Sequence, residues 1–183
     1  MKIRFMGIDA PESHLPTPEG VVGQGHFGDD AADFLAGLIP VSTRVQVEDL
    51  GTDKYKRTLG RIYTKGKDIN LRMIEAGWAV TYIICEGASC TKSLFKTERV
   101  AEYVKACERA QTYGRGIFDP TDPLEEMPFE FRIRVQDRVP TKYVGNFETK
   151  ELFDPEDYDE VPVCQRIFFS SKTAAKKVGY EYR

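Results

Sequence analysis

The fold is decided by two stretches of the chain: residues 1–13, which read MKIRFMGIDAPES, and residues 53–63, which read DKYKRTLGRIY. Polar and apolar residues alternate through the start of the first stretch, which is typical of a β-strand. Pro11 then interrupts strand pairing, because proline has no backbone N–H to donate. The second stretch begins as a charged loop and continues into another alternating segment over 59–63. The sequence thus predicts two strands with charged residues at their ends.

Periodicity and capping residues predict the remaining elements. Strands are expected at 43–47, 129–135 and 166–169, and helices at 31–38, 70–75, 95–113 and 172–177. Residues 13–27 are rich in glycine, proline and hydroxyl side chains and predict a long irregular loop. Asn70 is expected to cap the helix that starts there. Residues 119–128, rich in proline and acidic side chains, predict a boundary between domains.

The composition is that of an ordinary globular protein, with 41% hydrophobic, 30% charged and 11% aromatic residues. A chain of 183 residues is long enough for one well-packed domain and a small addition. No run approaches the roughly 20 apolar residues of a membrane-spanning helix, and no apolar segment typical of a signal peptide opens the sequence. We therefore expect no membrane span, and the composition leaves the compartment open.

The net charge of −3 argues against a broadly basic surface of the kind that binds nucleic acids. Much of the acidity, however, lies in residues 148–160, ETKELFDPEDYDE. Lysine and arginine cluster elsewhere, at 54–57 and at 132–134. A local cationic site is therefore compatible with an acidic chain.

The four cysteines, at positions 85, 90, 107 and 164, lack the repeated C-x-x-C spacing of a zinc site. Cys85 and Cys90 are close enough in sequence to form a disulfide in an oxidising compartment. Free or buried thiols are the alternative interpretation, so the cysteines do not decide the compartment.

Acidic and basic residues in the two opening stretches suit phosphodiester hydrolysis. That reaction needs a cation at the phosphate, a base that prepares water, and donors for the charge that builds on the phosphoryl oxygens. Asp9 offers a hard carboxylate ligand for Ca²⁺, and Glu12 a second carboxylate for water activation. Arg57 carries a planar fork that can grip two phosphate oxygens. Taken alone, each segment also has a simpler interpretation, as an ordinary turn or a solvated loop.

Taken together and in this order, the segments resemble the staphylococcal nuclease family over residues 2–118. The matching pieces are R-x-x-G-I-D-A-P-E, D-K-Y-x-R-x-L-G-R-I-Y, G-K-D-I-N-x-x-M-I-E-A-G-W-A and Y-G-R-G-I-F. The resemblance implies an α+β fold, mainly β, built as an OB-like five-stranded Greek-key barrel with three helices. It also implies a nuclease that cleaves DNA, RNA or both by calcium-dependent attack of water at phosphorus.

Roles for individual residues also follow from the resemblance. Arg4 and Arg57 match the family's two catalytic arginines, and Glu12 matches the glutamate assigned as general base. Asp9 matches a calcium-binding aspartate, and Ala10 stands where the family binds calcium through a backbone carbonyl. The residues expected to bind the nucleotide's phosphate are Lys54, Tyr55 and Tyr82, the last within one residue of the family's tyrosine. Arg4 and Asp9 are an odd number of residues apart, so on a single strand they start on opposite faces.

One part of the family pattern has no counterpart. The segment from Lys2 matches the family's third strand, and the D-G-D-T segment of the preceding hairpin, with its second calcium aspartate, does not occur in these residues. Such a barrel would be open and would expose an unpaired edge. Truncation is the preferred explanation over replacement by the tail or a partner chain, and over degeneration. We therefore expect impaired cleavage, with a noncatalytic nuclease-like module that binds protein or nucleic acid as the alternative function.

The tail predicts a further division of the chain. A nuclease-like domain is expected at 1–120, a linker with a strand at 121–140, and a small αβ module at 141–183. The tail pattern V-G-N…R-x-x-F-x-S-x-x-x-A-x-x-x-G-Y resembles the metal-binding domain of Ada-type repair proteins. The metal-ligand positions read Phe153, Tyr158 and Arg183. The resemblance therefore implies a module without metal ligands, whose partner is unknown, and the nuclease family implies a secreted or periplasmic location.

Overall fold

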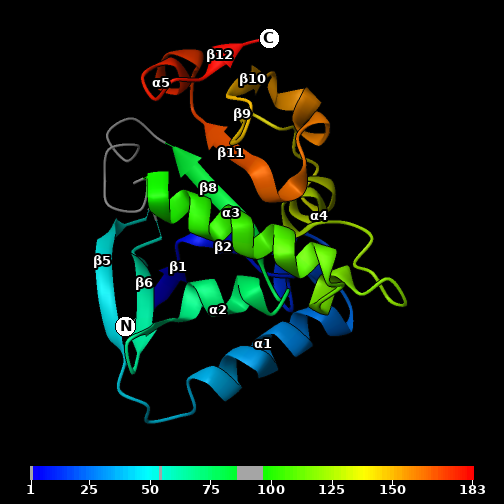
Figure 1. Cartoon of the computed structure of the whole chain (residues 1–183). Coiled ribbons are helices and arrows are strands. Elements are labelled where there is room, and N and C mark those ends of the chain that lie inside the picture. The colour runs from blue at the N-terminus through cyan, green and yellow to red at the C-terminus, as the bar shows by residue number, and fades with distance from the viewer. Residues whose placement is uncertain (1, 54, 86–96) are drawn as a thin grey trace.

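Two sheets, a short hairpin and five α-helices make up the mixed α+β fold of the described residues. The computed structural model describes residues 2–53, 55–85 and 97–183 (Figure 1). The α+β class agrees with the prediction, whereas the OB-like five-stranded barrel without its first hairpin stays a prediction.

The first sheet joins the N-terminal strand to the strand that follows the charged loop. Its members are β1 (Ile3–Phe5), β5 (Gln46–Thr52), β6 (Thr58–Thr64) and β7 (Lys67–Asp68). β1 runs parallel to β6, with Ile3 opposite Thr58. β5 and β7 are both antiparallel to β6. This pairing places the end of the 53–57 loop beside the first strand.

The second sheet contains strands from both the N-terminal part of the chain and the tail. In order across the sheet they are β12 (Glu181–Tyr182), β10 (Glu151–Phe153), β9 (Tyr143–Asn146), β11 (Arg166–Phe169), β8 (Val80–Cys85) and β2 (Gly7–Asp9). β11 pairs in parallel with one side of β8, with Ile167 opposite Ile83. β2 pairs antiparallel with the other side, with Asp9 opposite Val80. The tail thus extends the sheet that carries Asp9 (Figure 1), while the three-part division of the chain stays a prediction.

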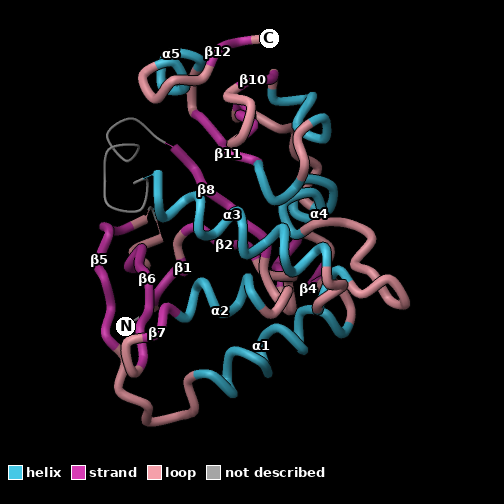
Figure 2. The backbone as a smooth tube through the Cα atoms, viewed as in Figure 1, coloured by secondary structure: helices cyan, strands magenta, loops and turns pink. Residues whose placement is uncertain are grey.

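In the described part of the chain, five α-helices accompany the sheets, and three of them pack together beside β8. They are α1 (His26–Leu38), α2 (Ile69–Glu75), α3 (Thr97–Thr112), α4 (Pro128–Val135) and α5 (Lys172–Lys176). α2 contacts both α1 and α3, and α3 lies across β8 (Figure 2). The main core lies between them and includes Met73, Ile74, Tyr103 and Val80. None of the described helices has the length and apolar character needed to cross a membrane.

The segment 13–27 is more regular than its composition predicts. β3 (Leu15–Thr17) and β4 (Gly20–Val22) form an antiparallel hairpin, and α1 begins as early as His26. The Thr17 hydroxyl donates to the Gly20 carbonyl at 2.9 Å, which closes the turn locally. Short hairpins of this kind leave too weak a periodic signal to be told from loop.

Residues 129–135 form the helix α4, so the predicted strand is wrong. Pro128 stands in the first turn of the helix, where a missing N–H costs no hydrogen bond. The Glu130 carboxylate accepts a hydrogen bond from the backbone N–H of Met127 at 3.0 Å and so caps the helix. The arginines of α4 then pair with acidic residues on other elements. Capping and these ion pairs outweigh the alternating pattern.

Asp68, not Asn70, caps α2 by accepting a hydrogen bond from the Leu71 N–H at 3.1 Å. Asn70 is fully buried, and its side chain binds the sheet instead. Its Oδ1 accepts from the Ile62 N–H at 3.2 Å, and its Nδ2 donates to the Met6 carbonyl at 2.9 Å. Asn70 therefore fixes the junction between β1 and β2 to β6.

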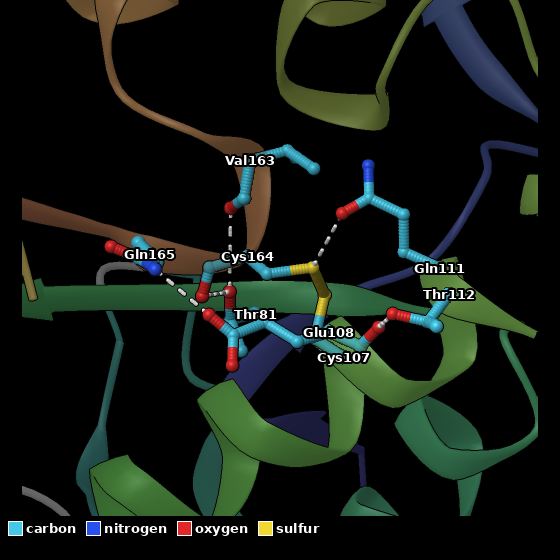
Figure 3. The surroundings of a disulfide bond; sticks show 8 residues. All are labelled: Thr81, Cys107, Glu108, Gln111, Thr112, Val163, Cys164 and Gln165. Carbon is cyan, nitrogen blue, oxygen red and sulfur yellow. Dashed lines mark hydrogen bonds between the residues drawn. A yellow bond between two sulfur atoms is a disulfide. The ribbon is translucent and has the colours of Figure 1, made fainter. Parts of the chain in front are cut away.

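A disulfide joins α3 to the tail. Cys107 of α3 is bonded to Cys164 in the short 3₁₀ helix η5 (Val163–Gln165), with their Cα atoms 5.5 Å apart (Figure 3). The Thr81 hydroxyl of β8 donates to the Cys164 carbonyl at 2.8 Å. The interpretation as free thiols is therefore wrong for these two cysteines. The other expected pair includes Cys90, which lies outside the described residues.

His26 is expected to make stability depend on pH. Its imidazole contacts Asp30 at 2.8 Å and Asp122 at 3.0 Å, so it joins the start of α1 to the proline-rich segment. The hydrogen bond with Asp30 raises the pKa of His26 above its ordinary 6.5. The folded protein therefore binds this proton more tightly than the unfolded chain does. The stabilisation is fully present below the unfolded pKa and is lost as pH rises through the folded pKa.

An NMR titration of the His26 ring protons tests this expectation. In Asp30→Asn the His26 pKa should fall towards its ordinary value, because the largest cause of the rise is removed. An unchanged His26 pKa in that variant would contradict the assignment.

Candidate functional site

Two acidic side chains from the N-terminal segment converge on one guanidinium group. Asp9 ends β2 and is only 6% exposed, and Glu12 follows in the next loop. Arg132 of α4 donates from Nη1 to Asp9 Oδ1 at 2.8 Å and from Nη2 to Asp9 Oδ2 at 2.7 Å. The same Nη1 donates to Glu12 Oε1 at 2.9 Å. Charge-assisted, bidentate contacts of this type are strong and fix geometry.

The electrostatics of the group follow from its burial. Burial raises the pKa of the Asp9 carboxyl, although Arg132 and Arg4 oppose that rise. Desolvation acts against the charge of Arg132, but the carboxylate of Asp9 outweighs it and raises the guanidinium's pKa, so Arg132 stays charged. Burial also raises the pKa of Tyr82, whose ring centre lies 5.6 Å from Arg132 Cζ. The phenol therefore stays neutral beside the ion pairs.

The loop that carries Glu12 is held through its backbone by Gln24. This glutamine is only 9% exposed, and its Oε1 accepts a hydrogen bond from the Glu12 N–H at 3.0 Å. Its own N–H donates to the Glu12 carbonyl at 2.8 Å, and its Nε2 donates to the Glu126 carbonyl at 2.7 Å. Gln24 thus ties the Glu12 segment to the segment that leads into α4.

Helix α1 approaches the same segment closely at Gly28, and replacement by alanine is expected to disturb it. A Cβ there would lie 2.6 Å from the Glu12 carbonyl oxygen and 2.7 Å from Ser13 Cα, both backbone atoms. We expect Gly28→Ala to destabilise the protein by about 1–3 kcal/mol, as overpacking does. Chemical denaturation measures this.

Gly37, in the same helix, is the matched control. A Cβ there meets nothing within 4 Å. Gly37→Ala should stabilise the protein by roughly 0.5–1 kcal/mol, because alanine is the better helix former. If both variants changed the free energy of unfolding by the same amount and sign, the prediction that a side chain at position 28 clashes with the Glu12 backbone would be contradicted.

A second cluster lies in the loop before β6. Arg57 Nε donates to Asp53 Oδ2 at 2.7 Å, and Asp53 Oδ1 accepts from the backbone N–H groups of Tyr55 and Arg57, each at 2.9 Å. Although desolvation acts to raise it, these hydrogen bonds hold the pKa of Asp53 below its ordinary value. The Arg57 Cζ lies 5.4 Å from the centre of the Tyr55 ring. Lys54, also predicted to bind substrate, lies outside the described residues.

Arg4 and Arg57 both keep terminal nitrogens without hydrogen bonds to the described part of the chain. Arg4 is half-buried on β1 and has no ion pair among the described residues, yet it is near enough to Asp9 to oppose the rise that burial causes in the pKa of Asp9. Arg57 precedes Thr58, whose N–H donates to the Lys2 carbonyl at 3.0 Å. The two arginine segments therefore lie on neighbouring strands of one sheet, while no direct contact joins Arg57 to Asp9 among the described residues.

The prediction that Arg4 and Asp9 start on opposite faces assumes that both lie on one strand, and that assumption is wrong. Gly7 has a φ of 81°, a left-handed conformation that favours glycine, and it turns the chain between β1 and β2. β1 belongs to the first sheet and β2 to the second. The odd spacing therefore does not place the two side chains on opposite faces.

Tyr82 packs among aromatic residues beside a small cavity. Its ring centre lies 5.0 Å from that of Phe168 and 5.8 Å from that of Phe129. The cavity has a volume of about 180 Å³ and lies between the rings of Tyr82 and Phe129, the helix α4, Gln136 and residues 138–142. Its described lining includes Arg132, Arg138 and Lys142 but no acidic side chain.

The donor set fits calcium only incompletely. Ca²⁺ takes about six to eight oxygen ligands. The described residues contain no group of three His, Cys, Asp or Glu side chains that could hold a metal ion. Asp9 and Glu12 supply two carboxylates, and both are engaged by Arg132. Ala10, whose carbonyl is the further expected ligand, is half-buried directly after Asp9.

Sequence reasoning missed Arg132 and Gln24. The R-x-R pattern at 132–134 indicates a cationic cluster, but its partners come from the opposite end of the chain. Gln24 sits in a glycine-rich stretch and carries no pattern of its own.

Comparison with known proteins identifies the family. The family described as staphylococcal nuclease homologue matches residues 2–118. Endonuclease YhcR of Bacillus subtilis is 35% identical over 186 residues, which cover 100% of this chain and 15% of that protein. An uncharacterized endonuclease of Haemophilus influenzae is 28% identical over 125 residues, covering 68% of this chain and 57% of that protein. A probable endonuclease LCL3 of Candida tropicalis is 33% identical over 87 residues, covering 45% and 34%.

The chain spans less than two thirds of each of these relatives. The Bacillus alignment includes the tail, whereas the family match ends before α4 and Arg132. The family match nevertheless covers well over half of the chain and includes Arg4, Asp9, Glu12 and Arg57. The chain therefore belongs to the family of staphylococcal nuclease homologues.

Proposed function

We propose that this protein hydrolyses phosphodiester bonds in DNA, RNA or both. The observation that carries the proposal is the convergence of Asp9 and Glu12 on a single cation, in a member of the nuclease family. Carboxylates held this closely around a positive charge are suited to bind a cation at a phosphate. The endonuclease names of the relatives support the same reaction class.

We assign Glu12 as the base that prepares water. Its backbone is fixed on both sides by Gln24, which limits how far the carboxylate can move. Arg4 and Arg57 are assigned to stabilise charge on the phosphoryl oxygens, because their terminal nitrogens donate no hydrogen bond to other described residues. Tyr55, 65% exposed beside Arg57, is positioned to contact a nucleotide, and Tyr82 would act from the edge of the cavity.

We propose Ca²⁺ as the cofactor, held by the Asp9 carboxylate and the Ala10 carbonyl, since hard oxygen ligands suit that ion. We also propose a secreted or periplasmic place of action. The Cys107–Cys164 disulfide supports it, because disulfides persist mainly in oxidising compartments.

The test combines cleavage with binding. Single-stranded DNA and RNA are incubated with the protein in Ca²⁺ or in a calcium chelator. Glu12→Gln should reduce cleavage by roughly 10²- to 10⁴-fold, the usual effect of losing a general base. The control is Glu19→Gln, an exposed residue at the tip of the β3–β4 hairpin. Calorimetric titration with a nucleoside bisphosphate gives a readout that needs no turnover. Absence of cleavage of both DNA and RNA in Ca²⁺ would refute the proposal, whether or not the nucleotide binds.

A noncatalytic binding module is the second candidate. The contact of both carboxylates with Arg132 favours it, because three of their four oxygens accept hydrogen bonds from the guanidinium and are less accessible to water or metal. In that case the protein binds the nucleoside bisphosphate, and neither DNA nor RNA is cleaved at any Ca²⁺ concentration.

A further inference from the structure

The contact between Arg132 and the carboxylate pair joins the family domain to a helix beyond it. Arg132 lies on α4, after the last residue of the family match, and is 123 residues from Asp9 in sequence. Its side chain is 21% exposed, and those of Asp9 and Glu12 are 7% and 25% exposed. Three of the four carboxylate oxygens of the pair accept a hydrogen bond from this one guanidinium. Solvent can therefore reach these three side chains, but most of the carboxylate oxygens already accept a hydrogen bond from Arg132.

We propose that Arg132 is an intramolecular cation that occupies the Asp9–Glu12 carboxylate pair and competes with a divalent cation for it. The inference rests on the proposed function, since it concerns the same two carboxylates. A divalent cation would need the oxygens to which Arg132 donates. The two positive charges would also repel each other at that distance in a partly buried site. Metal binding therefore requires the guanidinium to leave.

The structure provides a place for the displaced side chain. Arg132 already lines the cavity of about 180 Å³ beside α4, and the Tyr82 ring there offers a cation–π contact. Arg138 and Lys142 line the same cavity, so it is a less favourable position for a third cation. Arg132 consequently stays on the carboxylates until another cation replaces it. The strength of metal binding is thereby set by a helix outside the family domain.

A purely structural ion pair is the competing explanation, and calcium titration separates the two. CaCl₂ is titrated calorimetrically into the full chain and into Arg132→Gln, without nucleic acid. If Arg132 holds the pair more than about 90% of the time, its removal should tighten the apparent Ca²⁺ affinity by at least about 10-fold. Added Ca²⁺ should also raise the unfolding temperature more in Arg132→Gln than in the unaltered protein.

Arg134→Gln is the matched control. Arg134 lies on the same helix two residues away, pairs with Glu126 at 2.8 Å and is 64% exposed, so its loss should leave Ca²⁺ affinity unchanged. Arg132→Lys keeps the positive charge but lacks the planar guanidinium, so its Ca²⁺ affinity should rise less than that of Arg132→Gln. This second variant keeps the test decisive if Arg132→Gln fails to fold. Unchanged or weaker Ca²⁺ affinity in a folded Arg132 variant would overturn the proposal.

The outcome is separable from that of the proposed function. Tighter Ca²⁺ binding by Arg132→Gln without cleavage of DNA or RNA supports the competition and refutes the nuclease. Cleavage by the unaltered protein, with Ca²⁺ affinity the same in the Arg132 variants, refutes the competition and leaves the nuclease standing.

Discussion

Replacing Cys107 and Cys164 together by alanine should lower the free energy of unfolding by about 4 kcal/mol. The crosslink closes a loop of 57 residues between α3 and η5, and a loop of this size restricts the unfolded chain strongly. Both cysteines are buried, so the lost sulfur contacts act in the same direction. Denaturant unfolding, followed by circular dichroism, measures the change.

The single variants Cys107→Ala and Cys164→Ala are the controls. Either one breaks the crosslink, so each should lose nearly as much stability as the double variant. Losses that simply add, or a total below about 1 kcal/mol, would show that the disulfide contributes little.

Arg57→Ala should reduce kcat/KM for nucleic-acid cleavage by about 10²- to 10³-fold, as removal of one donor to a developing oxyanion does. Arg57 uses Nε for Asp53, so its two terminal nitrogens can bind phosphate without breaking the loop's own hydrogen bonds. Arg57→Lys should recover little, because lysine lacks the planar guanidinium that can bind Asp53 through Nε and two phosphate oxygens through its terminal nitrogens.

Arg44 provides the comparison for this arginine. It is exposed on the loop before β5, and Arg44→Ala removes the same charge at a distance from the site. Steady-state kinetics on single-stranded DNA should show Arg44→Ala near the unaltered protein. If both arginine variants lost activity equally, the effect would come from net charge and not from a phosphate contact at Arg57.

Much of the fold follows from local pattern. The strands around Ile3 and Leu59, the helix around Phe34 and the strand from Arg166 all occur near their predicted positions. In α1 the apolar face predicted from the sequence is the face that packs: Ala31 is buried, and Phe34 and Leu35 pack against the main core, so period and packing agree. Lys65 and Gly66 form the short turn between the paired strands β6 and β7.

The elements and site residues that the sequence did not predict correctly depend on contacts between residues that are distant in sequence. The alternating residues of 129–135 carry a strand pattern, but the segment's ion pairs and its Pro128 cap select a helix. The strand Val80–Cys85 was not predicted, because both of its neighbours come from far away in the chain. Within the site, Asp9 and Glu12 could be selected from sequence, whereas Arg132 could not, since only the tertiary fold brings it to them.

Because β11 pairs with β8, the folded unit extends beyond the residues that match the family. A polypeptide ending at residue 118 would contain the whole family match and yet leave one side of β8 unpaired. The unpaired backbone N–H and C=O groups on that side of β8, around Ile83, could then pair with a strand of another chain. The tail thus covers the side of β8 that the residues of the family match alone would leave without a hydrogen-bonding partner.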